Sequence, residues 1–146
     1  MGVTQLIYTS TAVRDMSAAD LEALMTTAKA RNAELDITGM LVYFSQTREF
    51  IQLLEGKRSS VLELYRNVIA KDDRHRDCGV YYEDYAEERL CPDWGMSFKI
   101  ENEGSVQDRL KVSDFIDGGS LGSDEMAMPL LVMVGYRDMG IRKHSA

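Results

Sequence analysis

The sequence predicts an α+β fold of the ferredoxin-like type, with strands and helices in the order βαββαββ. Three observations predict this fold. Two segments repeat apolar residues at helical spacing behind helix-start signals, five short segments are rich in β-branched or aromatic residues, and two of those five are separated by only four polar residues. This order packs most economically as a mixed, mainly antiparallel sheet with two helices on one face, and further helices are expected at the C-terminal end.

The first predicted strand covers residues 3–10. Residues 37–44 and 49–54 are predicted to form a hairpin, because a short polar turn joins them. Two more strands are expected over residues 78–85 and 94–100, separated by a loop that contains a proline. In a ferredoxin-like arrangement the first and third strands are central neighbours.

The two predicted helices each begin at a capping box, in which a serine caps the helix and an acidic residue follows three positions later. The boxes pair Ser17 with Asp20 and Ser60 with Glu63. Behind each box, apolar residues recur at helical spacing and give the helix one apolar face. They are Leu21, Leu24, Met25 and Ala28 in the first helix, and Val61, Leu64, Tyr65, Val68 and Ile69 in the second.

The pattern changes after residue 103, which predicts a domain over residues 1–103 and a helical extension over residues 104–146. The extension is expected to hold a short helix over residues 105–116, a link rich in glycine and serine, and a second helix with Pro129 in its first turn. The second helix is apolar nearly all round. We therefore expect it to be buried, either on the open face of the sheet or against another subunit.

The composition excludes several classes of function. At 146 residues the chain is long enough for one domain, and 45% hydrophobic with 28% charged residues is typical of a soluble globular protein. A formal net charge of −7 argues against binding to nucleic acid or to an anionic membrane, because both need a clustered positive face. No apolar run approaches the roughly 20 residues that a membrane span needs, and the N-terminus has no secretion signal. Cys78 and Cys91 have no CxxC spacing, so we expect reduced thiols in a cytoplasmic protein.

One polar residue stands out within the third predicted strand. Phe50, Gln52 and Leu54 share a face of that strand, so an uncharged amide lies in the middle of an apolar stripe. Burying an amide without partners costs roughly 2–7 kcal/mol, so Gln52 must have hydrogen-bond partners there. In the predicted fold, Tyr8 of the first strand faces the same layer and can lie beside Gln52.

Metal and hydrolytic sites have little support. The histidines are His75 and His144, no carboxylate cluster has metal-ligand spacing, and no histidine is placed near a serine-bearing turn. The phosphate-binding patterns GxGxxG and GxxxxGK[ST] are missing from the sequence. We interpret His75 as a structural loop residue. What remains is a set of neutral hydrogen-bonding groups, Tyr8, Gln52 and Asn32, which suits a flat polar heteroaromatic ligand better than a phosphate or an ester.

Five short motifs, in this order, resemble the BLUF family of blue-light sensors that use FAD. They are Leu6-Ile7-Tyr8-Thr9-Ser10; Ala30-Arg31-Asn32 followed by Ile37-Thr38-Gly39-Met40-Leu41; Phe50-Ile51-Gln52-Leu53-Leu54-Glu55-Gly56; Asp72-Asp73-Arg74-His75; and Trp94-Gly95-Met96. The resemblance covers roughly residues 3–101. The segment after it is similar in length to the helical tails of short, stand-alone BLUF proteins.

The resemblance implies a flavin, FAD with FMN as the alternative, whose isoalloxazine ring lies between the two helices and over the sheet. Tyr8 matches the family's redox-active tyrosine and Gln52 its switching glutamine, while Trp94 and Met96 are the candidates for contact with Gln52. No metal is implied. The residues implied to bind the cofactor are Tyr8, Ser10, Leu24, Ala28, Arg31, Asn32, Leu41, Phe50, Gln52, Leu54, Ile69 and Asp72.

The resemblance also implies a photoreceptor rather than an enzyme. Tyr8 gives an electron and then a proton to the excited flavin, the Gln52 amide rotates or tautomerises, and a red-shifted signalling state follows. We expect the signal to pass through the fifth strand and the C-terminal helices of a homo-oligomer to an unidentified downstream effector protein. Two alternatives stay open: an acylphosphatase-like hydrolase, and a light-independent ferredoxin-like domain that binds a small regulatory ligand.

Overall fold

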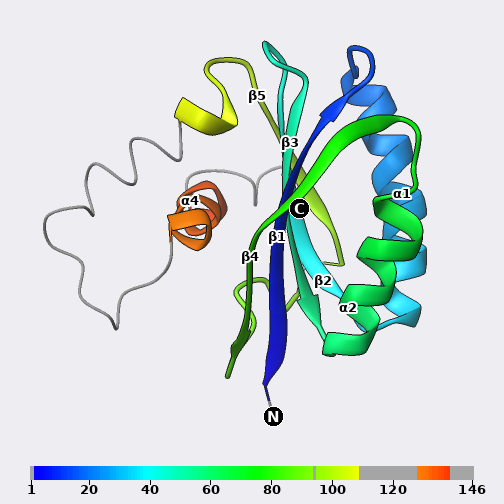
Figure 1. The fold of residues 1–146 in the computed structure, drawn as a ribbon, viewed down its shortest axis with the longest axis vertical. Coiled ribbons are helices and arrows are strands. Elements are labelled where there is room, and N and C mark those ends of the chain that lie inside the picture. The colour runs from blue at the N-terminus through cyan, green and yellow to red at the C-terminus, as the bar shows by residue number, and fades with distance from the viewer. Residues whose placement is uncertain (1, 94, 109–127, 139–146) are drawn as a thin grey trace, which may run out of the picture.

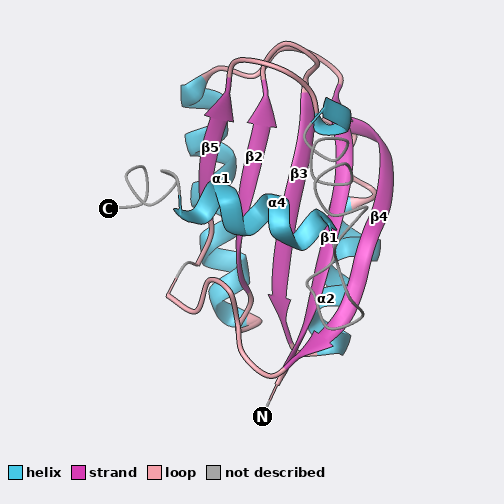
Figure 2. Ribbon diagram, turned by 90° about the vertical axis from the view of Figure 1, so that its left-hand side faces the viewer, coloured by secondary structure: helices cyan, strands magenta, loops and turns pink. Residues whose placement is uncertain are grey.

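The computed structural model of the chain describes residues 2–93, 95–108 and 128–138. Its strands form one five-stranded sheet in the order β4-β1-β3-β2-β5, which Figure 1 shows nearly edge-on and Figure 2 face-on. Neighbouring strands are antiparallel except β2 and β5, which run parallel. The α+β, ferredoxin-like prediction is therefore confirmed, with β1 and β3 as neighbours inside the sheet. The strand bounds are β1 Val3–Ala12, β2 Thr38–Phe44, β3 Glu49–Gly56, β4 His75–Ala86 and β5 Ser97–Glu101.

Helices cover both faces of this sheet. Helices α1 (Ala18–Glu34) and α2 (Arg58–Leu64) lie on one face, and α4 (Met128–Tyr136) crosses the other (Figures 1 and 2). Helix α2 continues into a π-helical turn, η1 (Tyr65–Ile69), in which the N–H of Ala70 donates to the Tyr65 carbonyl at 2.8 Å. The strand alternation divides the core accordingly, because successive side chains point to opposite faces. Tyr8, Phe50 and Leu54 belong to the core under α1 and α2, whereas Ile51 and Leu53 belong to the core under α4.

The capping box at α1 is confirmed and the one predicted at Ser60 is wrong. The Ser17 hydroxyl accepts from the Asp20 N–H at 3.1 Å, and the Asp20 carboxylate accepts from the Ser17 N–H at 2.9 Å. Helix α2 instead starts with Lys57 as its N-cap, and no side chain caps it. The buried residues of α2 start at Val61, whose N–H already donates to the Lys57 carbonyl at 2.9 Å. Ser60 therefore lies inside the first turn and cannot cap the helix.

Val68 does not follow its predicted place on the apolar face of the second helix. Val68 is 40% exposed, whereas Ile69 is buried. The π-helical turn explains the difference, since a turn closed by i→i+5 bonds holds more residues than an α-helical turn and shifts every later side chain around the axis. The turn keeps Ile69 on the core and moves Val68 toward the rim.

Two strands begin three residues away from their predicted starts, and the other strand bounds differ from the prediction by at most two residues. Strand β4 begins at His75 rather than at residue 78, because β1 continues to Ala12 and pairs there with His75. Strand β5 begins at Ser97, where pairing with Met40 of β2 starts. Trp94, which was expected to begin this strand, lies outside the described residues.

The apolar helix near the C-terminus lies on the open face of the sheet, the first of the two places expected for it. Its buried side chains, Leu130, Val132, Met133 and Tyr136, pack with residues of β1, β2 and β3. The other predicted C-terminal helix, over residues 105–116, falls mostly outside the described residues; residues 106–108 of it are helical. In the part of the chain that is described, no helix has both the length and the apolar character needed to cross a membrane.

Candidate functional site

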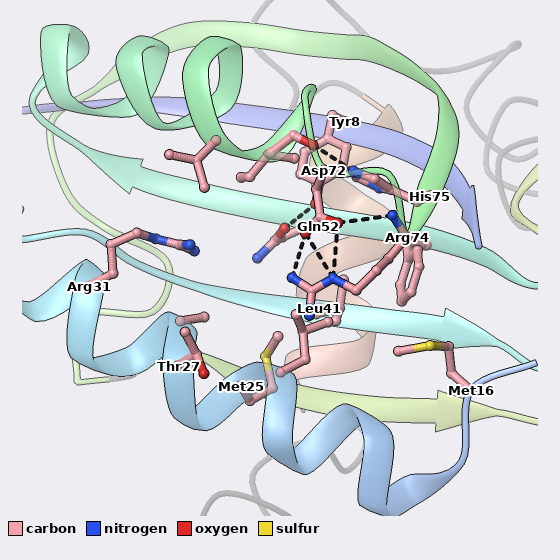
Figure 3. A pocket seen from close by; sticks show the side chains of 15 residues that line it. Tyr8, Met16, Met25, Thr27, Arg31, Leu41, Gln52, Asp72, Arg74 and His75 are labelled. Atoms are coloured by element: carbon pink, nitrogen blue, oxygen red, sulfur yellow. Dashed lines mark hydrogen bonds and ion pairs between the residues drawn. The ribbon is translucent and has the colours of Figure 1, made fainter. Parts of the chain in front are cut away.

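A cavity lies between α1 and the α2–η1 helix, with the sheet as its floor. Its free space, including the part open to solvent, is about 670 Å³. Figure 3 shows side chains that converge on it from both helices and from the sheet. The lining residues are Tyr8, Met16, Leu24, Met25, Thr27, Ala28, Arg31, Leu41, Phe50, Gln52, Val68, Ile69, Asp72, Arg74 and His75.

A chain of hydrogen bonds crosses the cavity floor through Gln52. Tyr8 and Gln52 are direct partners in the antiparallel pairing of β1 and β3, so their side chains point to the same face. The Tyr8 hydroxyl donates to Oε1 of Gln52, and Nε2 of Gln52 donates to Sδ of Met96 at 3.3 Å. Met96, immediately before β5, is fully buried. The amide therefore has a partner at each end, which accounts for a glutamine on an apolar stripe.

Tyr8 keeps its proton in this environment. Burial raises the pKa of the Tyr8 phenol well above its ordinary value, with smaller increases from Cys78 and Tyr65, while Arg31 acts in the opposite direction. The Tyr65 ring lies 5.3 Å from the Tyr8 ring, centroid to centroid. A neutral phenol can donate its hydrogen to Gln52, and it is the form that gives up an electron and a proton together.

Polar atoms at the C-terminal end of α1 are buried without protein partners. Asn32 is 1% exposed, and both its side-chain Oδ1 and Nδ2 lack a hydrogen bond, as does Nε of Arg31. The Asn32 backbone is well fixed, since its carbonyl accepts from the N–H groups of Leu35 and Ile37 at 3.1 and 2.9 Å. Buried polar groups normally have partners, so these atoms suit a ligand with donors and acceptors along one edge.

Two further contacts close the wall of the cavity at η1 and β4. Asp72 and Arg74 form an ion pair, with Nε of Arg74 at 2.9 and 3.0 Å from the two carboxylate oxygens, and this pair lowers the pKa of Asp72. His75 lies 2.7 Å from the Ser10 hydroxyl through Nδ1 and 2.6 Å from the Ile69 carbonyl through Nε2. Because a carbonyl only accepts, Nε2 carries a proton. His75 thus ties β1 to η1.

Most of the residues predicted to bind the cofactor line the cavity, and three do not. Ser10 bonds to His75, Asn32 lies buried beside Arg31, and Leu54 is fully buried in the core. The nine that line it are Tyr8, Leu24, Ala28, Arg31, Leu41, Phe50, Gln52, Ile69 and Asp72. Whether they contact a flavin remains a prediction.

The sequence reasoning missed six lining residues: Met16, Met25, Thr27, Val68, Arg74 and His75. Thr27 could have been found, because it completes the helical spacing of Leu24, Ala28 and Arg31 on one face of α1. His75 was interpreted as a loop residue but is the first residue of β4. Among the described residues, no group of three or more His, Cys, Asp or Glu side chains could hold a metal ion.

Comparisons with known proteins agree on one family. The family model "Sensors of blue-light using FAD" (BLUF) matches residues 3–97. The photoactivated adenylate cyclase subunit beta of Euglena longa is 40% identical over 100 residues, which are 68% of this chain but only 11% of that protein. The dark-state structure of BlrB, a BLUF protein, matches with 28% identity and a TM-score of 0.61, covering 82% of this chain and 86% of BlrB. The photo-activated state of BlsA has the same fold, with a TM-score of 0.70 and 21% identity over 94% of this chain and 96% of BlsA.

The family model spans most of the described sheet and both helices that enclose the cavity. It also spans Tyr8, Gln52 and Met96, the residues of the hydrogen-bond chain. The chain therefore belongs to the BLUF family of blue-light sensors that use FAD.

Proposed function

We propose that this blue-light photoreceptor switches through Tyr8 and Gln52, which act on a flavin held in the cavity between α1 and α2. The observation that carries the proposal is the hydrogen-bond chain that runs from Tyr8 and Gln52, on the cavity floor, to the buried Met96. The light-independent and acylphosphatase-like alternatives are not favoured, since the family is one of light sensors. A BLUF domain is a sensor and not a catalytic domain.

The residues around the cavity fit a flavin. The unpartnered atoms of Asn32 and Arg31 would bond to the polar edge of its ring system, and Leu24, Ala28 and Ile69 would contact its flat faces. FAD is favoured because the family is described by it. FMN stays the alternative, since a solved Klebsiella pneumoniae BlrP1 structure, 30% identical to this chain, contains FMN.

The protein's own part in the light reaction is a movement of hydrogen. A bound flavin supplies a strong one-electron oxidant when blue light excites it. Tyr8 would pass one electron and its phenolic proton to the excited flavin and later recover both, so no atom would be gained or lost over the cycle. While Tyr8 lacks its proton, Oε1 of Gln52 has lost its donor and the amide is free to turn or tautomerise. The two ends of an amide are nearly equal in size, so two arrangements can fit the same space.

Purified full-length protein tests the proposal directly. We expect a yellow protein with flavin absorption and a small, reversible red shift after blue light. Tyr8→Phe should retain the flavin and abolish the shift, because the ring stays but no hydrogen can be donated to Gln52. Tyr65→Phe is the matched control, since its ring lies 5.3 Å from that of Tyr8 but Gln52 accepts from Tyr8. A colourless protein that takes up no flavin, or a normal red shift in Tyr8→Phe, would contradict the proposal.

A route for the signal runs from Met96 into β5 and α4. Glu101, the last residue of β5, accepts from the Tyr136 hydroxyl of α4 at 3.0 Å. Arg137, which follows α4, donates to the Leu90 carbonyl at 3.0 Å. These contacts support a signal path from the domain over residues 1–103 into its C-terminal extension. We expect the receiver to be a separate effector protein and the photoreceptor to act as a homo-oligomer. The chain spans 11% of the Euglena cyclase subunit, so the cyclase activity in that name stays with that protein. Two free cysteines support a cytoplasmic location.

A further inference from the structure

Glu55 is a completely buried carboxylate outside the cavity. It lies near the end of β3, three residues after Gln52, and therefore points to the opposite face of the sheet. A buried carboxylate is costly unless its oxygens are fully bonded. The hydrogen-bond donors around Glu55 therefore show which segments its carboxylate fixes in place.

Three N–H donors converge on the two oxygens of Glu55. Oε2 accepts from Nε2 of Gln5 at 2.8 Å and from the Leu90 backbone N–H at 2.7 Å, while Oε1 accepts from the Cys91 backbone N–H at 2.8 Å. An ionised carboxylate is the side chain that suits this arrangement, because it only accepts. A glutamine at the same place would turn an N–H group toward one of the three donors. Burial, and after it the Glu55 charge, raises the pKa of the neighbouring Cys91 thiol to about 12.

Two of the three donors belong to the segment between β4 and β5. The same segment is held from outside by Arg89, which donates to the Glu55 carbonyl at 3.1 Å and to the Thr38 hydroxyl at 2.9 Å. Cys91 packs in the core under α4 and Met96 in the core under α1 and α2, and β5 begins at Ser97, which pairs with Met40. Met96 lies five residues after Cys91 and directly before β5.

We propose that Glu55 is a positioning residue for the light switch. By fixing the backbone of Leu90 and Cys91, it holds Sδ of Met96 against the amide nitrogen of Gln52. The inference rests on the proposed function and adds a residue to it. The Gln52 amide turns beside Sδ of Met96 in both directions, so a less firmly held Met96 lowers the barrier to the return as well as to the forward turn. Loss of the Glu55 carboxylate should therefore speed the return from the lit to the dark state.

The decisive variant is Glu55→Gln, studied in the full-length, flavin-loaded protein. We expect dark recovery to be roughly 2- to 10-fold faster than in the wild type, the range that corresponds to one hydrogen bond of ordinary strength. Gln5→Met is the matched control, because it removes one donor from the same carboxylate but leaves the bonds to Leu90 and Cys91. Glu49→Gln controls for the lost charge. Glu49 also lies on β3, and its carboxylate accepts from the Val106 N–H at 3.1 Å.

A second readout needs no light. Amide hydrogen exchange at Leu90 and Cys91 should be faster in Glu55→Gln and unchanged in Gln5→Met, because only the first variant removes their acceptor. In a Met96→Leu background, Glu55→Gln should have no further effect on recovery, since the contact that it positions is gone. If Glu55→Gln does not fold, Arg89→Met loosens the same segment from the surface and takes its place, with the same expected acceleration.

The failure of this inference differs from the failure of the proposed function. A wild-type protein without a light-induced red shift would defeat the proposed function. A wild type that switches normally, with a dark recovery in Glu55→Gln equal to or slower than its own, would overturn the inference alone. An equal acceleration in Gln5→Met or Glu49→Gln would also overturn it, because the effect would then come from lower stability or altered charge.

Discussion

At the residue scale, the two ends of the Gln52 amide are held with unequal strength. Its oxygen accepts from a phenol, a strong donor, whereas its nitrogen donates to a thioether sulfur, a weak acceptor. Turning the amide therefore gives up a good bond only on the Tyr8 side. In the proposed mechanism, oxidation of Tyr8 would remove that bond at its source, so the same residue would both respond to the excitation and release the switch.

Asn32 leads to a prediction about affinity. Because both polar atoms of its side chain are buried and unpartnered, we expect Asn32→Ala to leave the free energy of unfolding of the flavin-free protein within about 0.5 kcal/mol of the wild type. The variant should bind flavin about 5- to 100-fold more weakly, through the loss of two hydrogen bonds. Urea unfolding and fluorescence titration with flavin measure the two effects.

Asn67→Ala on η1 is a suitable comparison for this prediction, since Asn67 is exposed and is not among the residues that line the cavity. It should change neither quantity. Equal flavin affinity in Asn32→Ala and the wild type would mean that the unpartnered amide does not face the ligand.

At the element scale, the close approach of β2 and β3 depends on Gly39. A Cβ atom at this position would lie 1.9 Å from the Leu53 backbone oxygen, a contact that only a shift of one strand can relieve. We expect Gly39→Ala to lower the free energy of unfolding by about 1–3 kcal/mol. Chemical denaturation measures the loss. Gly79→Ala in β4 is the control, because a Cβ atom there meets no atom within 4 Å. Equal stability of the two variants would show that β2 can move without cost.

The elements also show what a sequence pattern can and cannot predict. Strand alternation correctly placed Tyr8 beside Gln52, because pairing of β1 and β3 follows from the order of elements. The start of α2 could not be read from Ser60, because α2 begins at Arg58, directly after the end of β3 at Gly56 and the N-cap Lys57. A capping hydrogen bond stabilises less than the burial of Val61 and Leu64. The π-helical turn leaves no local signal, and it decides which of Val68 and Ile69 faces the core.

The candidate site was predictable where a residue is unusual for its strand or belongs to a motif. Gln52 and Tyr8 are of this kind. Arg74 pairs with Asp72, only two residues away, so its place was within reach of the local sequence. His75, in contrast, is held by the Ser10 hydroxyl, 65 residues away in the sequence, a long-range contact. The pattern of neighbouring residues does not contain such contacts.

At the scale of the whole molecule, the sheet separates the cavity from the C-terminal helix α4. The cavity lies on the face covered by α1 and α2, and α4 lies on the other face (Figure 2). Met96 belongs to the first core and Cys91 to the second, so the segment between β4 and β5 joins both. In the proposed signal route, a change at Gln52 would reach α4 through Met96 and this segment.

This separation leads to a prediction about α4. Met133 is fully buried between α4 and the sheet, and an aspartate there would place an unpaired charge in an apolar core. We expect Met133→Asp to release α4 and expose apolar residues of β2 and β3, so that the protein self-associates, which light scattering would detect. Flavin binding should persist, because the cavity lies on the far face. Gly135→Ser on the same helix is the control, since a Cβ atom there meets no atom within 4 Å. If Met133→Asp also abolished flavin binding, the two faces of the sheet would not be independent. If the variant stayed in the wild-type oligomeric state, α4 would not be needed to cover the sheet.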